Sequence, residues 1–564
     1  MPQSILDRAR LLALVPVPIS DAQLDDLLFV SKAELEGREG DGLLVSVTPD
    51  RLDLLSEGGL ALHLQGALDA VHGLPPIATP SREEAPAAFA VDASVAPIRP
   101  YVAGVLVRAP SGTELDAGTL AEAIRVQELL HTSIGRDRRV ASLGVYPFDD
   151  ARSPIRYALE PLRDVRFVPL DGSEETDGDR FFREHPMAAR YGAYGRVGDR
   201  CLSLRDADGT VLSLPPILNS RAGGEARPGD RTLLLESTGT RLRSVREALG
   251  LLLVVFAARG WSVSPVAVAG PDGTAVPGTD VLEPRAIDLP SGFLHAITGE
   301  PLSSPEVERR LGRARLSARP HPGGWKVAVP PWRPDLLTPV DLAEDVVLAV
   351  PVRAQDGIVP PSPTRGRRRP ETIFRRRFAT ALLGLGLAAP HTSLLVSEAS
   401  VARLAGASPV RLTNPVSAEF AVLRDRLLLS FVDVLQHNTR HRYPQGFGEV
   451  GPVVVASPTA ESGAETRYRA GLVLARETAG FADVAGMVEY LLRGVDAIAV
   501  REPADLPGTI PGRAARARIA GESVAELGEL HPRLLSSLGV PVPVAWAELD
   551  LSALWSISGG RDTH

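Results

Sequence analysis

The spacing of apolar residues at the start of the chain predicts a small mixed module. Ser20, which lies between Ile19 and Asp21, is placed to cap a helix. Residues 45–48 have the composition of a strand and residues 49–50 begin a turn, while residues 53–68 carry apolar residues at helical spacing. We therefore expect at least one strand and two helices before residue 72.

The middle of the chain alternates between extended and helical patterns. From about residue 98 to residue 275, apolar runs typical of strands are separated by amphipathic segments typical of helices. The predicted strands are residues 101–107, 211–218 and 233–236, and the predicted helices are residues 118–130 and 242–258. The acidic stretch 171–179 is predicted to be an exposed loop.

Two further units follow. The first reads as a strand, a helix (305–311), a second strand (325–329) and a helix that begins near Pro339. The last part of the chain reads as another α/β domain, with helices at 371–386 and 483–495 and strands near 409–412 and 450–455.

Pro-rich stretches divide these patterns into domains. Residues 73–97 are rich in Pro and Ala, and residues 353–370 are rich in Pro and Arg, so both are predicted to be linkers. The fold class is therefore α/β and α+β multidomain. The predicted domains are residues 1–72, 98–275, 284–352 and 371–564.

Composition excludes several classes of protein. The 564 residues carry a net charge of −8, which excludes a uniformly basic nucleic-acid wrapper. Two short arginine runs, 365–369 and 375–377, fit a solvated linker or helix face better than a polyanion site. A single cysteine, Cys201, excludes an internal disulfide and a Cys-rich zinc site. The longest apolar run, 251–258, is far below the roughly 20 residues that span a bilayer, and we expect a cytoplasmic protein.

An acidic cluster is the clearest candidate for metal chemistry. Asp341, Glu344 and Asp345 fall at positions i, i+3 and i+4, so a helix places them on one face, and Asp335 lies one loop upstream. Oxygen ligands without His or Cys suit Mg²⁺. A solvated acidic helix start explains the same pattern, and the spacing alone favours this second interpretation.

A second candidate is Glu236, at the end of the apolar strand 233–235. A carboxylate there could orient a substrate amine or a water molecule, although a structural hydrogen bond to a nearby loop is the commoner role. The sequence contains no phosphate-binding loop, no His-Glu-x-x-His and no Gly-x-Ser-x-Gly motif. His437 and His441 lie four residues apart, but no Glu between them could activate a metal-bound water.

Short segments spread in order along most of the chain carry a resemblance to a known family. The segments are residues 45–56, 127–136, 154–157, 167–170, 185–191, 214–220, 235–240, 331–346, 412–424, 443–451, 511–513 and 529–532. Each short string is weak evidence, but their common order is specific. Together they resemble the β subunit of phenylalanyl-tRNA synthetase in its short archaeal/eukaryotic-like form.

The resemblance implies an architecture that agrees with the predicted boundaries. Residues 1–72 would form a B1-like module and residues 98–275 a B3/B4-like domain of the editing type. Residues 284–352 would form a B5-like domain with a winged, DNA-binding-like fold. Residues 371–564 would form a B6/B7-like domain, similar to the antiparallel sheet of class II synthetases but without catalytic residues.

The resemblance also implies partners, cofactors and sites. An α subunit would charge tRNA with phenylalanine, using ATP and Mg²⁺, while this chain supports an α2β2 assembly, helps to hold tRNA and removes misattached tyrosine. The implied magnesium ligands are Asp335, Asp341, Glu344 and Asp345, which reverses the preference for a solvated helix start. The implied editing pocket contains Tyr146, Pro215, Pro216, Asn219, Glu236 and Thr238.

Two departures from the family bear on editing. Tyr146 stands where the family pattern has a His, and residues 221–226 replace a Thr-containing segment. A pocket that recognises a hydroxyl discriminates strongly only while its hydrogen-bond partners are present, so we expect weakened editing. The departures also keep open the alternative of a specialised paralogue that uses an unusual aromatic amino acid or serves as a resistance copy. A second alternative is a stand-alone module that binds nucleic acid through the B5-like fold.

Overall fold

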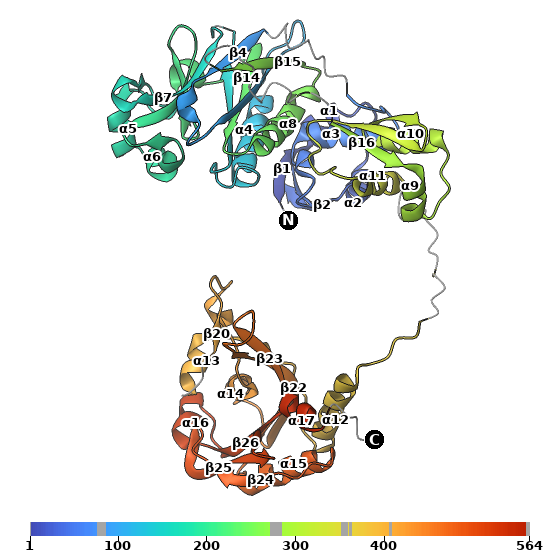
Figure 1. The fold of residues 1–564 in the computed structure, drawn as a ribbon, viewed down its shortest axis with the longest axis vertical. Coiled ribbons are helices and arrows are strands. Elements are labelled where there is room, and N and C mark those ends of the chain that lie inside the picture. The colour runs from blue at the N-terminus through green and yellow to red at the C-terminus, as the bar shows by residue number, and fades with distance from the viewer. Residues whose placement is uncertain are drawn as a thin grey trace. The chain divides into compact units, whose positions relative to one another are not determined.

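The computed structural model describes residues 2–75, 86–149, 151–270, 282, 285–350, 359, 364–404 and 409–559. The chain divides into two compact units, residues 1–358 and 359–564 (Figure 1). Within the described part, no helix is both long enough and apolar enough to span a membrane.

The N-terminal module is a three-stranded antiparallel sheet, in the order β1-β3-β2, with helices packed against it. Ser20 caps α2 in a capping box with Gln23, which confirms the predicted helix start. The predicted helix after the turn is divided by Ser56 into a 3-10 turn and a longer helix. The elements are β1 (Gln3–Asp7), α1 (Arg8–Ala13), α2 (Asp21–Val30), β2 (Ala33–Glu39), β3 (Gly42–Val47), η1 (Leu52–Leu55) and α3 (Glu57–Ala67).

The central domain is built on a ten-stranded sheet whose main path runs β13-β12-β11-β7-β4-β15-β5-β14-β6, with β10 paired to β11. Its pairs are antiparallel except for those that β4 forms with β7 and β15. The strands are β4 (Ala87–Val91), β5 (Tyr101–Arg108), β6 (Ala141–Pro147), β7 (Ile155–Pro161), β10 (Arg196–Val197), β11 (Arg200–Arg205), β12 (Val211–Leu214), β13 (Leu218–Asn219), β14 (Thr232–Gly239) and β15 (Ser262–Ala269).

The prediction that residues 73–97 form a linker is wrong for its second half. Strand β4 lies inside the sheet, with parallel partners on both sides, and Phe89 is fully buried. Its Ala-rich sequence, Ala-Ala-Phe-Ala-Val, hid this role because small residues carry little hydrophobic signal. The central domain therefore begins before residue 98.

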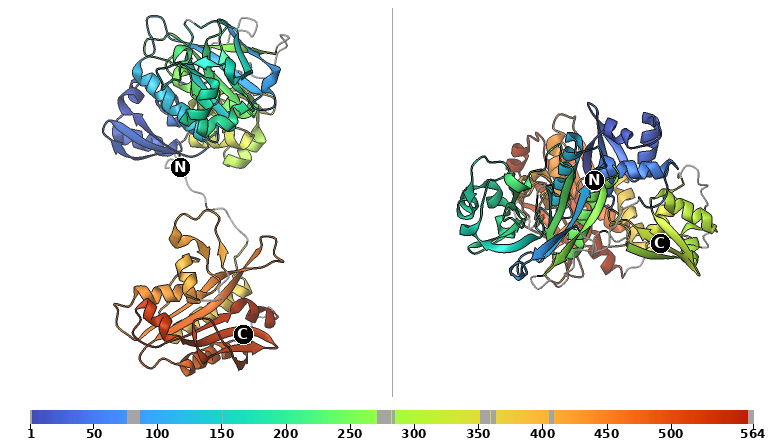
Figure 2. Two further views of the ribbon diagram at one scale, coloured as in Figure 1. Left: turned by 90° about the vertical axis from the view of Figure 1, so that its left-hand side faces the viewer. Right: turned by 90° about the horizontal axis from the view of Figure 1, so that it is seen from above.

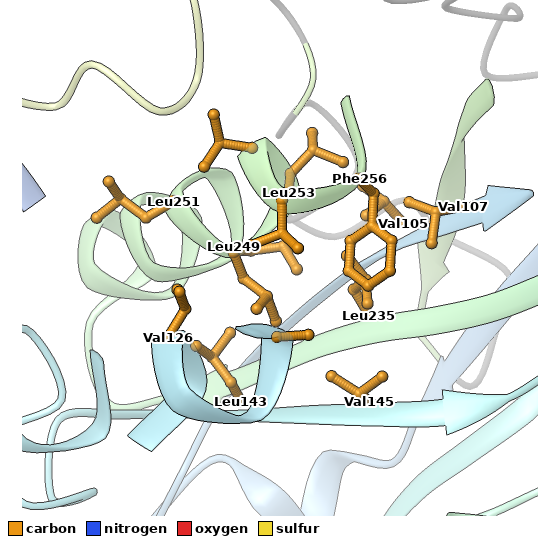
Figure 3. Close-up of a cluster of buried hydrophobic side chains, with 14 of the residues drawn as sticks. Val105, Val107, Val126, Leu143, Val145, Leu235, Leu249, Leu251, Leu253 and Phe256 are labelled. Carbon is orange, nitrogen blue, oxygen red and sulfur yellow. The ribbon is translucent and has the colours of Figure 1, made fainter. Parts of the chain in front are cut away.

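Two helices, α4 (Ala117–Thr132) and α8 (Leu242–Ala257), pack together and against one face of the sheet (Figure 3). Both helices agree with the predicted segments to within two residues. Alternate residues of β6 and β14, such as Leu143, Val145 and Leu235, enter this core with Leu249 and Phe256 of α8. The intervening residues, including Tyr146 and Glu236, therefore point to the opposite face.

A small satellite covers residues 162–194 of the central domain and has its own core around Phe167, Phe181 and Tyr191. The stretch predicted as an exposed loop, 171–179, ends in a short strand and the start of a helix. The satellite elements are η4 (Leu162–Asp164), β8 (Arg166–Phe167), β9 (Thr176–Asp177), α5 (Gly178–Glu184), α6 (Pro186–Tyr191) and η5 (Gly192–Tyr194).

The third domain of the first unit is a three-stranded antiparallel sheet, in the order β16-β18-β17, with three helices. It contacts the N-terminal module through α10 and α3, where Gly66 lies so close to the Arg313 carbonyl that an added Cβ would approach that oxygen to 1.9 Å. The elements are β16 (Arg285–Pro290), α9 (Ser291–Thr298), α10 (Ser304–Arg313), β17 (Ser317–His321), β18 (Gly324–Val329) and α11 (Pro339–Leu348).

The second unit is built on a six-stranded sheet in the order β22-β23-β27-β26-β25-β24, antiparallel throughout, which confirms the predicted sheet type (Figures 1 and 2). One core joins the sheet to α12, α15 and α17, and another joins it to α14 and α16. The main elements are α12 (Pro370–Gly384), α13 (Glu398–Arg403), α14 (Leu427–His437), β22 (Gln445–Ala456), β23 (Ala464–Ala475), α15 (Phe481–Arg493), β24 (Val500–Pro503), β25 (Thr509–Ile519), β26 (Glu522–Leu530), α16 (Pro532–Leu538), β27 (Val544–Asp550) and α17 (Leu551–Ile557). A minor sheet, in the order β19-β21-β20, contains β19 (Leu395–Val396), β20 (Val410–Arg411) and β21 (Val422–Leu423).

Candidate functional site

A cavity of about 330 Å³ lies at the β6 edge of the central sheet, where α4 approaches the β12–β13 turn. Five of the six residues predicted for the pocket line it: Tyr146, Pro215, Pro216, Asn219 and Glu236. The sixth, Thr238, lies two residues further along β14, where it is fully buried and accepts a hydrogen bond from Arg99. The structure therefore brings residues from distant parts of the sequence into one cavity.

Glu236 is the buried carboxylate of this cavity, with 2% of its surface exposed. Its Oε2 accepts a hydrogen bond of 2.9 Å from Tyr146, and its Oε1 accepts none from any described residue. Burial raises the pKa of Glu236 to about 7, even though the Tyr146 hydrogen bond favours the charged form. The side chain can therefore gain or lose a proton near neutral pH and can accept a hydrogen bond from a ligand.

Tyr146 joins two strands that are distant in the sheet order. Besides donating to Glu236 on β14, its hydroxyl shares a hydrogen bond of 2.9 Å with Ser213 Oγ on β12. The Tyr146 proton is already donated to Glu236, so Ser213 acts as the donor in the second bond. Burial, together with the charge of Glu236, raises the pKa of Tyr146 well above its ordinary value, so the phenol stays protonated.

Gly144 makes room for this phenol. A Cβ at position 144 would lie 2.1 Å from the Tyr146 hydroxyl oxygen, so the ring lies over the glycine and reaches along the sheet toward Glu236. Gly144 is also the direct cross-strand partner of Glu236 in the β6–β14 register. Any larger residue at position 144 would displace the Tyr146 ring.

The rim of the cavity carries a second polar network on α4. The Leu143 amide donates to His131 Nε2 at 2.9 Å, so the ring proton lies on Nδ1, which donates to Glu128 at 3.1 Å. Arg138 binds the same Glu128 carboxylate at 2.9 Å and packs over the Tyr191 ring. Burial lowers the pKa of His131, which keeps the ring neutral.

The cavity is also lined by polar residues that were not predicted as pocket residues, among them Glu128, His131, Arg138 and Ser213. Glu128 and His131 are three residues apart at the end of the predicted helix 118–130, and this spacing is the sequence signal that pairs them. Nothing local marks Ser213, because its partner Tyr146 lies 67 residues away in the sequence. The replaced segment 221–226 contributes Gly224, Glu225 and Ala226 to the cavity wall.

In this structure the four carboxylates predicted to bind Mg²⁺ have separate partners, and the binding of Mg²⁺ by these residues stays a prediction. Within the described ranges, no group of three or more His, Cys, Asp or Glu side chains is arranged to hold a metal ion. The Arg333 guanidinium lies between two of the four, with Nη2 at 2.8 Å from Asp335 and 2.9 Å from Asp345. All three side chains are buried, so one guanidinium cation is shared between two carboxylates.

The remaining two carboxylates have other partners. Asp341 Oδ2 accepts from the amides of Leu337 and Thr338 at 2.8 and 2.7 Å, and so caps α11. Glu344 forms an ion pair of 2.7 Å with Lys32 of the N-terminal module. Asp341, Glu344 and Asp345 do lie on one helix, α11, and Glu344 links this helix to the N-terminal module.

Comparisons with known proteins cover nearly the whole chain. Residues 287–350 match the family model of the tRNA synthetase B5 domain, and residues 357–551 match that of the phenylalanyl tRNA synthetase beta chain CLM domain. The phenylalanine–tRNA ligase β subunit of Korarchaeum cryptofilum is 32% identical, over 94% of this chain and 95% of the relative. That of Aeropyrum pernix is also 32% identical, over 98% and 99%.

A solved structure supports the same relationship for the first unit. The N-terminal fragment of the phenylalanyl-tRNA synthetase β subunit from Pyrococcus horikoshii superposes with a TM-score of 0.56 at 26% identity, over 62% of this chain and 99% of the fragment. The sequence matches extend this similarity into the second unit. The chain belongs to the family of phenylalanine–tRNA ligase β subunits.

Proposed function

We propose that this chain is the non-adenylating β subunit of a cytoplasmic phenylalanine–tRNA ligase, which assembles with an α-like subunit as an α2β2 complex and helps to hold tRNA. In this proposal the α-like subunit charges tRNA with phenylalanine, using ATP and Mg²⁺. The observation that carries the proposal is the end-to-end match to β subunits, which includes both the B5 domain and the beta-chain domain. A partner is needed because the family is named for one subunit of a ligase.

Assembly is the direct test of this proposal. The chain, of 59.9 kDa, would be co-expressed with the α-like subunit of the same genome, and the mass of the purified complex measured. We expect a complex that contains two copies of each chain. Recovery of this chain alone, at the mass of a monomer, would argue against a ligase subunit and would favour a stand-alone binding module.

We also propose that the cavity of the central domain does not remove tyrosine efficiently from mischarged tRNA. Tyr146 already donates its hydroxyl to one oxygen of Glu236, so a tyrosine substrate would compete with a resident phenol for this carboxylate. The test is deacylation of Tyr-tRNA by the complex. Rapid release of tyrosine would contradict this proposal and leave the subunit assignment intact.

The alternative of a specialised paralogue gains no support from the comparisons, because the relatives described above are named as phenylalanine–tRNA ligase β subunits. It predicts a complex that forms but charges another aromatic amino acid. Charging assays with phenylalanine and with tyrosine distinguish the two proposals.

A further inference from the structure

A short arginine-rich segment precedes helix α12 of the second unit. Arg365, Arg367, Arg368 and Arg369 fall within five residues, and all four are exposed. In the described part of the chain, none of the four has an ion-pair partner. Some other arginines of the same unit are paired, for example Arg403 with Asp433 and Arg518 with Glu502.

This segment does not stabilise the fold locally. Arg369 is the N-cap residue of α12 and makes no side-chain capping hydrogen bond, and Glu371 is the acidic residue of the first turn. Four positive charges next to the positive end of a helix dipole repel it and one another. The cluster stands out because the whole chain carries a net charge of −8. A bound polyanion would replace this repulsion with attraction between the arginines and its negative charges.

We propose that residues 365–369 bind the phosphate backbone of the tRNA substrate. This inference rests on the proposed function, which supplies an RNA ligand, and it assigns one contact surface for that ligand. The segment reads Arg-Gly-Arg-Arg-Arg, without an apolar or aromatic side chain to bury. Protein interfaces have an apolar centre, whereas phosphate contacts need only accessible positive charge, so the composition favours RNA over an acidic protein surface.

The backbone of the segment suits such a contact. Residues 364–369 belong to no helix or strand, and Arg369 has extended φ and ψ values of −64° and 142°. An extended chain places the first and last of the four arginines up to about 14 Å apart. The guanidinium groups can therefore spread along several phosphates without any change in the sheet of the second unit.

The salt dependence of tRNA binding tests this inference. The variant R365Q/R367Q/R368Q/R369Q would be compared with the control R440Q/R442Q/R501Q/R533Q, which removes four exposed arginines scattered over the same unit. Dissociation constants for tRNA would be measured for the complex with the α-like subunit over a range of KCl concentrations. If no complex forms, the full chain alone is assayed in the same way.

We expect the plot of log affinity against log salt to become shallower by about 1 for each phosphate that the cluster variant no longer binds, while the control keeps the wild-type slope. Affinity at low salt should fall at least about tenfold. Equal slopes for the two variants would overturn the inference. An unchanged slope together with dissociation of the α-like subunit from the cluster variant would also overturn it and would assign the segment to an acidic protein partner. Failure of the wild-type complex to charge tRNA would instead count against the proposed function.

Discussion

Tyr146 and Glu236 share a hydrogen bond of 2.9 Å across the neighbouring strands β6 and β14, inside the wall of the cavity. Glycine at position 144 allows the phenol to lie over the strand and reach the carboxylate. The Tyr146 hydroxyl supplies the buried Glu236 carboxyl with a hydrogen-bond donor. It also occupies a position where the hydroxyl of a ligand could otherwise bind. We therefore propose that the stability of the central domain and the ligand selectivity of its cavity depend on the same pair.

Replacement of Tyr146 by Phe should destabilise the protein. The change leaves Glu236 buried with neither oxygen accepting a hydrogen bond, and an unsatisfied buried acceptor costs about 1–3 kcal/mol. Thermal unfolding of the wild type and the variant measures the effect. The control is Ser213→Ala, which leaves the Glu236 bond in place and should cost less. An equal destabilisation in both variants would show that the Tyr146–Glu236 hydrogen bond stabilises the protein no more than the Tyr146–Ser213 hydrogen bond.

Stability should fall as pH rises through the titration of Glu236. Its pKa in the folded protein, about 7, lies above its ordinary value of 4.5, so the folded state holds the proton more tightly than the unfolded state. The tighter proton binding adds to the free energy of unfolding. This contribution is complete below the ordinary pKa of 4.5 and is lost as pH rises to about 7. The variant Glu236→Gln cannot titrate, so its melting temperature should fall less than that of the wild type between about pH 5 and pH 8. Parallel plots of melting temperature against pH for the two proteins would exclude a raised pKa of Glu236.

Removal of divalent metal should leave the first unit as stable as before, because Arg333 already forms ion pairs with both Asp335 and Asp345. We expect equal melting temperatures in EDTA and in Mg²⁺. In contrast, Arg333→Met should lower the free energy of unfolding by about 3–5 kcal/mol, since it leaves two buried carboxylates unpaired. Glu344 is half exposed in its ion pair with Lys32, so Glu344→Gln should lower the free energy of unfolding by less than about 1 kcal/mol. A clear drop in melting temperature with EDTA would contradict this expectation and support a bound magnesium ion.

The packing of the N-terminal module against the third domain can be tested at Gly66. Its Cβ would lie 1.9 Å from the Arg313 carbonyl oxygen, so Gly66→Ala should force α3 and α10 apart at a cost of about 1–3 kcal/mol. The matched control is Gly292→Ala in α9, where a Cβ meets open space and alanine favours the helix. Similar melting temperatures for the two variants would show that the modules do not pack as described.

The sequence predicted elements where periodicity was strong. Helix α8 and strand β5 agree with their predicted segments because a long periodic pattern of apolar residues distinguishes a helix from a strand. Strand β4 was missed because its small residues resemble a linker, although the fully buried Phe89 fixes it in the sheet. Local patterns could not show pairs such as Tyr146 and Ser213, which the curvature of the sheet brings together.

The acidic helix shows a different limit. Spacing predicts that Glu344 and Asp345 share a helix and a face with Asp341, but the same spacing is compatible with a metal ion, solvent or a protein cation. Only the three-dimensional structure shows that Arg333 is the cation between Asp335 and Asp345 and that Lys32 reaches Glu344 from another domain. The resemblance to a family identified the residues but not the partners that they have here.

A charging assay with purified subunits decides whether this chain is a ligase β subunit. Attachment of phenylalanine to tRNA in the presence of ATP would be measured for the α-like subunit alone, for this chain alone and for the two together. We expect charging only when both chains are present, with phenylalanine preferred over tyrosine. Charging by the α-like subunit alone at the rate of the pair, or no charging by the pair, would contradict the assignment of this chain as a ligase β subunit.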